Sequence, residues 1–238
     1  MPITSSPDLP QKYDEYDRKQ KAIASVRSLK KRISSVHDVL QLEELKGRKR
    51  VLRRLGFTTS EDVVEMKGRV ACEISTGDEL LLTEMMFGGT FNPLTPEQCA
   101  ALLSCFVFQE KSEAKVKIRE ELAAPLRVLQ ETARRIAKVS NESKIPVVED
   151  EYVQSFKVEM MEPVLQWCKG ASFAELCKLT DVYEGSIIRC FRRLQELLRQ
   201  MGQAANAIGN KELEEKFTKA LEMLEKPNSI IFSPSLYL

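Results

Sequence analysis

Four arginines recur at short intervals between residues 189 and 199, with a glutamate among them. A guanidinium group is permanently charged, and it binds phosphate through parallel hydrogen bonds or stacks on a base. A row of such groups at one-turn intervals can follow a phosphate backbone. The row consists of Arg189, Arg192, Arg193, Glu196 and Arg199. A solvated helix face is the competing interpretation, because charged faces are common and few of them bind a ligand.

One amphipathic helix, from Thr180 to Gln200, is predicted to carry this row. At about 100° per residue, six apolar side chains fall on the side opposite the charges. Asp181, with Glu184 three residues later, predicts an acidic, capping-box-like start of the helix. We expect burial of the apolar side to turn Arg189, Arg193 and Glu196 outward together. The apolar residues are Ile187, Phe191, Leu194, Leu197, Leu198 and Met201.

The sequence offers little for self-contained catalysis. Its single histidine, His37, falls in a charged N-terminal stretch, which argues against a catalytic triad or an HExxH metal site. No G-x-x-x-x-G-K-[ST] loop is present to hold nucleotide phosphates. The carboxylates at Glu149–Glu151 follow an apolar run, but we interpret them as complementing a helix N-terminus. We therefore predict no catalytic residue, no metal site and no bound cofactor in this chain.

Composition indicates an intracellular, soluble protein. The 238 residues include 36 basic and 35 acidic side chains, so binding to RNA would require local patches of charge. The six cysteines form no CxxC pair, and we expect them to be reduced core residues. No apolar run reaches the roughly 18 residues that a membrane span needs.

The first 74 residues are predicted to form two parts. Residues 1–45 hold a Pro/Ser-rich lead and a long charged helix with a narrow apolar seam, which needs a partner helix or remains solvated. Residues 46–74 begin with a basic helix that ends at Gly56. A short turn at Thr59–Ser60 and a β-like run from Lys67 to Ile74 follow, as at the end of a winged helix. The seam consists of Ile23, Val26, Leu29, Ile33, Val36 and Leu40.

Residues 75–238 are predicted to form a bundle of capped helices, so the fold class is all-α. The expected start signals are Ser75 with Asp78, a capping box at Thr95, and a second box formed by Ser172 and Glu175. The stretch AALLSCFVF should be buried on all sides. We expect Pro125 to kink or split a helix running from about residue 113 to 139, and an interruption near Pro163. A break at residues 206–210 should precede a last helix that ends near Lys226.

Several long strings, in order, resemble the C-terminal part of a known helicase family. They are ELKGRKRVLRRLGF (44–57), EMKGRVACEIS (65–75), ELLLTEMMFGGTFN (79–92), LLSCFVFQE (102–110), TDVYEGSIIRCFRRLQELLRQ (180–200) and SLYL (235–238). The family is the Mtr-type, nuclear exosome branch of the superkiller DExH-box RNA helicases. The resemblance covers essentially the whole chain. It implies a protruding stalk-like helix (1–45), a winged-helix remnant (46–74) and a DSHCT helical bundle (75–238).

The resemblance also implies a mechanism. In this family two RecA-like motor domains bind ATP and Mg²⁺ and step along RNA from 3′ to 5′. The bundle's ratchet helix touches the threaded single strand and delivers it to the nuclear exosome and its adaptor complexes, for RNA decay and rRNA processing. Arg193 and Glu196 match the ratchet positions that meet RNA, and Arg189 lies on the same predicted stripe. The implied location is the nucleus, including nucleoplasm and nucleolus.

This chain departs from the family because motor domains and arch tip are missing from the sequence. We therefore expect an RNA-guiding module that is inactive alone as an ATP hydrolase, although its parent family is enzymatic. The alternative is a stand-alone helical protein-interaction module without a role on RNA. RNA affinity that falls on substitution of Arg193 would favour the first.

Overall fold

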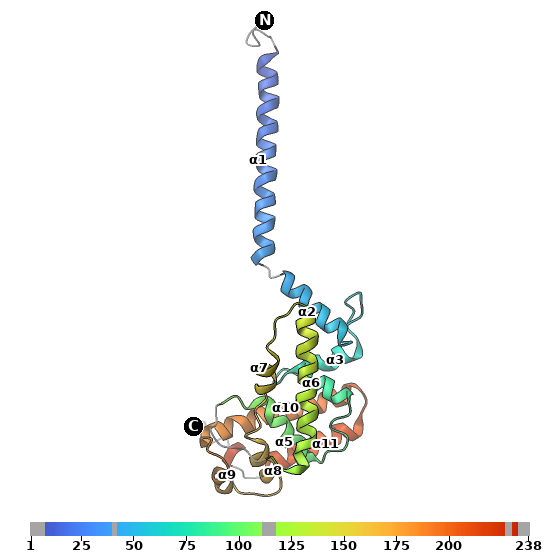
Figure 1. The fold of residues 1–238 in the computed structure, drawn as a ribbon, viewed down its shortest axis with the longest axis vertical. Helices are drawn as coiled ribbons and strands as arrows, with labels where there is room; N and C mark the ends of the chain where they lie inside the picture. Colours follow the sequence, from blue (N-terminus) through green and yellow to red (C-terminus); the bar gives the residue numbers. More distant parts are fainter. Residues whose placement is uncertain (1–7, 40–41, 111–117, 227–229, 233–238) are drawn as a thin grey trace. The chain divides into compact units, whose positions relative to one another are not determined.

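The computed structural model describes residues 8–39, 42–110, 118–226 and 230–232 (Figure 1). Within these ranges the regular secondary structure is helical, apart from an isolated antiparallel bridge between Thr58 and Val64. The predicted all-α class is therefore confirmed. The chain forms two compact units, residues 1–47 and 48–238. The predicted domain boundaries after residues 45 and 74 stay predictions.

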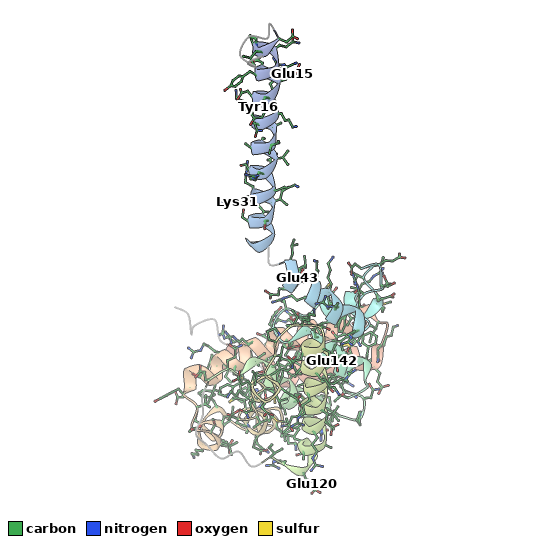
Figure 2. All side chains as sticks on the ribbon, turned by 45° about the horizontal axis from the view of Figure 1, so that its top comes forward. Glu15, Tyr16, Lys31, Glu43, Glu120 and Glu142 are labelled. Atoms are coloured by element: carbon green, nitrogen blue, oxygen red, sulfur yellow. The ribbon has the colours of Figure 1, made fainter. Side chains whose placement is uncertain are left out.

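The first unit contains the long helix α1 (Leu9–Val39) and the start of α2 (Leu42–Arg54). Charged side chains such as Glu15 and Lys31 project from α1 into solvent (Figure 2). The described members of the apolar seam are also exposed, from 44% at Ile23 to 58% at Ile33. Ion pairs one turn apart, such as Lys21 with Asp17 at 2.6 Å, support the helix only weakly. The side chains of His37 and Leu40 lie outside the described residues.

In the second unit, α2 ends at Arg54, and Gly56 follows in the left-handed conformation with φ +75°. The predicted β-like run from Lys67 to Ile74 is wrong, because α3 (Met66–Cys72) occupies it. No neighbouring strand is described there to pair with, whereas a helix satisfies its own backbone groups. Gly68 is required by close packing: a Cβ would lie 2.4 Å from the Phe57 carbonyl oxygen.

A buried carboxylate fastens α3 to the bundle. Glu84, on α4 (Glu79–Phe87), has only 4% of its side chain exposed. It forms ion pairs with Lys67 of α3 and with Arg135 of α6 (Glu120–Glu142). Lys67 also donates to the Leu55 carbonyl at 2.8 Å, so three helices and the end of α2 are linked at one point.

The core of the bundle is α5 (Pro96–Val107), which packs against α8, α10 and α11. All nine residues of AALLSCFVF (100–108) are buried, as expected. The surrounding helices are α7 (Glu149–Gln154), α8 (Met161–Cys168), α9 (Phe173–Leu179), α10 (Glu184–Ala207) and α11 (Lys211–Glu225), with a 3₁₀ turn at Ile230–Phe232. The start of the predicted 113–139 helix lies partly outside the described residues.

Most predicted helix boundaries are confirmed. Both capping boxes form, at Thr95 and at Ser172, and Asp78 accepts a hydrogen bond from the Leu81 amide at 2.8 Å. The break after α10 contains Gly209, with φ +71°, and Asn210 caps α11. Ser75 is an exception, since its amide binds the side chain of Gln200 rather than capping a helix.

The two prolines follow the prediction only in part. Pro125 lies inside α6 and does not split it, since the helix continues to Glu142, and the expected kink stays a prediction. The interruption expected near Pro163 comes earlier, between Gln154 and Met161, and Pro163 itself lies in the first turn of α8. A first-turn proline costs little, because its missing amide proton would have no partner within the helix.

Candidate nucleic-acid interface

Helix α10 carries the predicted contact residues, but it begins later than expected. It starts at Glu184 with Tyr183 as N-cap and no capping side chain, so Asp181 does not cap it. The Thr180 hydroxyl instead accepts from the Val182 amide at 3.2 Å. This local turn competes with helix formation over residues 180–182. At its other end the helix continues past Gln200 to Ala207.

The predicted orientation of α10 is confirmed. The six apolar side chains predicted to face the core are at most 1% exposed, and Phe191 packs edge-on against Trp167 with ring centroids 5.5 Å apart. Arg189, Arg193 and Glu196 are exposed on the other side. We call these three residues the α10 polar face. The buried residues are Ile187, Phe191, Leu194, Leu197, Leu198 and Met201.

Two arginines of the predicted row lie further round the helix. Arg192 is partly buried and donates from Nε to the Ile231 carbonyl at 3.0 Å. Arg199 pairs with Glu225 of α11 at 2.9 Å. Both therefore hold neighbouring segments against α10, and the cationic stripe is narrower than the sequence predicts.

The two arginines of the polar face contact residues just beyond α5. The sequence did not indicate these contacts. Arg189 forms an ion pair with Glu110 at 2.7 Å and donates to the Ser186 hydroxyl at 3.0 Å. Arg193 donates to the side-chain oxygen of Gln109 at 3.3 Å. These groups line a cavity of about 260 Å³ at the surface. Hydrogen bonding from Ser186, and then from Arg189, lowers the pKa of the Glu110 carboxyl below its ordinary value.

The other end of the polar face is fixed by Gln200, which is only 7% exposed. Its amide nitrogen donates to Glu196 at 3.0 Å, and its oxygen accepts from the amides of Ser75 at 2.9 Å and Thr76 at 3.0 Å. Glu196 is therefore held by a residue that is itself anchored, and its carboxylate also lies 3.9 Å from the Arg199 guanidinium.

Comparison with known proteins gives this geometry a context. Residues 61–233 match the DSHCT (NUC185) domain. The chain belongs to the DSHCT family. Over its whole length it is 60% identical to "ATP-dependent RNA helicase mtr4" of Schizosaccharomyces pombe, of which it covers 21%. It is 57% identical to "Exosome RNA helicase MTR4" of Mus musculus and 56% identical to that of Homo sapiens, covering 23% of each.

The predicted relationship to the C-terminal part of Mtr-type DExH-box helicases is therefore confirmed. The chain spans about a fifth of the length of these curated relatives. Among the strings that carried the resemblance, SLYL lies outside the described residues.

The DSHCT chain offers binding rather than acid–base chemistry at this face. Burial raises the pKa of the Cys190 thiol, directly under the arginines, to about 12, so the thiol is neutral at physiological pH. In the described part of the chain no group of three or more His, Cys, Asp or Glu side chains could hold a metal ion. No described helix is long and apolar enough to cross a membrane. Permanent positive charge beside a carboxylate suits reversible contact with a phosphate backbone.

Proposed function

We propose that this chain is an RNA-guiding module of an ATP-dependent, 3′-to-5′ RNA helicase that supplies the nuclear exosome. The observation that carries the proposal is the α10 polar face: three exposed charged residues held outward by a fully buried apolar side. Full-length similarity to proteins named as exosome RNA helicases supports it.

The module is proposed to act on single-stranded RNA as part of a larger assembly. RecA-like motor domains would bind ATP and Mg²⁺ and move the strand, while this chain holds no cofactor and contacts the strand through α10. The exosome and its adaptor complexes, and a location in the nucleus, belong to the same proposal. The chain alone is expected to show no ATP hydrolysis, because its sequence has no loop for the phosphates.

Guidance of the RNA strand is proposed to depend on a balance between attraction to the arginines and repulsion by the glutamate of the polar face. Arg189 and Arg193 lie one turn apart and can contact neighbouring phosphates or stack on bases. Glu196, fixed by Gln200, repels the same phosphates and limits how tightly the strand is held. A strand that must slide needs contacts of this moderate strength.

A second candidate function has its own supporting observation. Arg189 and Arg193 are both bonded to residues just beyond α5, as side chains that stabilise the fold would be. In that case the chain is a helical protein-interaction module, and the charged face has no ligand.

RNA binding by the purified chain distinguishes the two functions. We expect a labelled oligouridylate to bind with an affinity that falls steeply with salt, and Arg193→Ala to weaken it. Arg134→Ala is a matched control, because Arg134 is also an exposed arginine but lies on α6. Equal affinities for the two variants and the unmodified chain would reject guidance by α10 and favour the interaction module.

A further inference from the structure

A second, larger cavity lies beside the α10 polar face. Its volume is about 480 Å³, within the range of sites that hold small organic ligands. Three segments line it: the loop Thr76–Asp78 before α4, Phe106 with Gln109 at the end of α5, and the loop Ser155–Lys157 after α7. Gln109 lines this cavity and also the smaller one under Arg189 and Arg193, so the two cavities are neighbours that share one wall residue.

The polar face of α10 and its anchor hold two sides of this cavity. On one side Arg193 is hydrogen-bonded to Gln109 at 3.3 Å. On another side Gln200, which also fixes Glu196, accepts from the Thr76 amide at 3.0 Å. The cavity is therefore bordered by residues that also contact Arg193 and Gln200.

The lining combines an apolar floor with one available cation. We call Phe106 and Phe156, the two aromatic residues of the lining, the floor; each is 8% exposed, and their ring centroids lie 5.1 Å apart. Asp78 is engaged at both carboxylate oxygens, by the Leu81 amide at 2.8 Å and the Tyr152 hydroxyl at 2.6 Å. The Lys157 ammonium makes no hydrogen bond or ion pair with any residue that the structure describes, although its backbone amide is fixed on the Cys105 carbonyl at 3.2 Å.

The cavity wall is formed in advance of any ligand. A Cβ atom at Gly77 would lie 2.9 Å from Leu82 Cδ1 and 3.4 Å from Phe106 Cβ, so the loop rests directly on the core. Its backbone is also tied to Gln200. Because this loop is already fixed, little free energy would be lost in ordering it when a ligand binds, and this favours a higher affinity.

We propose that this cavity is a nucleotide subsite for the same RNA strand, with the Lys157 ammonium on a phosphate and the base over the phenylalanine floor. The inference rests on the proposed guidance by α10 and extends the strand's path from Arg193 past Gln109 to Lys157. The choice of RNA as the occupant rests on the shared wall residue Gln109, which is bonded to Arg193, and on the cationic Lys157, rather than on volume alone.

Salt titration of RNA binding tests this subsite. For a single strand, the slope of log K against log salt changes by about 0.7 for each phosphate that the protein neutralises. With an oligouridylate of about ten nucleotides, Lys157→Ala should flatten the slope by this amount, whereas Lys157→Arg should retain it. Lys219→Ala is the matched control, because Lys219 is an exposed lysine on α11 away from this cavity. Circular dichroism would establish that each variant is folded.

Photocrosslinking supplies an independent readout. An oligouridylate carrying 4-thiouridine should crosslink to the peptide that contains Ser155–Lys157, and Arg193→Ala should reduce that crosslink. If Lys157→Ala behaves like Lys219→Ala and this peptide is not crosslinked, the subsite is wrong, while an effect of Arg193→Ala would leave guidance by α10 intact. If Arg193→Ala also has no effect, both proposals fail.

Discussion

Substitution of Arg193 distinguishes a helix face that guides the RNA strand from a solvated face that binds no ligand. In a chimera that joins this chain to the motor domains of the fission yeast relative, we expect Arg193→Ala to slow unwinding more than ATP hydrolysis. Under the proposed function, the substitution would remove a contact with the strand and leave the motor unchanged. Parallel unwinding and ATPase assays measure the two rates. Equal slowing of both rates, or of neither, would contradict the role proposed for Arg193.

Under the proposed function, Glu110 would compete with RNA for Arg189. Its carboxylate lies 2.7 Å from the guanidinium, the group proposed to bind a phosphate. Glu110→Gln removes this competing charge, so we expect RNA affinity to rise about two- to fivefold, as for an exposed ion pair. Fluorescence anisotropy would measure it, with Glu131→Gln on α6 as an exposed control. An unchanged affinity for Glu110→Gln would indicate that Arg189 does not touch the strand.

The Glu110 carboxylate also determines how the RNA affinity is expected to depend on pH. Because its pKa is lowered from 4.5, Glu110 is ionised above its ordinary pKa, and its pairing is lost only as the pH falls through the lowered value. The thiol of Cys190 has its pKa raised and remains neutral until strongly alkaline pH. RNA affinity should therefore be flat across the neutral range. A transition near neutral pH would indicate a titrating group other than these two.

At the scale of elements, the orientation of α10 depends on its buried side. Phe191 is fully buried against Trp167, so Phe191→Ala should lower the free energy of unfolding by about 3–5 kcal/mol. Urea denaturation followed by circular dichroism measures this, and the exposed Gln203→Ala should change it by less than about 0.5 kcal/mol. A loss below about 1 kcal/mol for Phe191→Ala would mean that this ring is not a core contact.

Helix periodicity predicted the faces of α10, because a 24-residue amphipathic helix repeats its pattern many times. Patterns that extend over only a few residues gave wrong predictions. Eight residues from Lys67 to Ile74 were too few to distinguish a strand from a buried helix, and a hydroxyl at Thr180 displaced the expected cap. Gln109 and Glu110 could not be found from sequence pattern, since they meet α10 about 80 residues later in the chain.

At the scale of the whole molecule, only the unit from residue 48 onward has a hydrophobic core in the described residues. Helix α1 leaves its aliphatic seam exposed, and an isolated helix without a packed partner frays. We expect its backbone amides to exchange quickly, in contrast to those of α5, which is buried. Hydrogen exchange with mass spectrometry compares the two helices. Slow exchange across residues 15–39 in a proven monomer would contradict this expectation.

The pairing of the α10 polar face with Glu110 also bears on how quickly a strand is captured. Arg189, Arg193 and Arg199 carry three positive charges, and Glu110, Glu196 and Glu225 carry three negative ones in the same area. Such an arrangement projects almost no net field beyond the Debye length, about 8 Å at physiological ionic strength. Long-range steering, which accelerates many encounters with nucleic acid, is therefore weak here. Under the proposed function, the strand's arrival would therefore depend on delivery by the motor domains rather than on diffusion, and salt would act mainly on how fast the strand leaves.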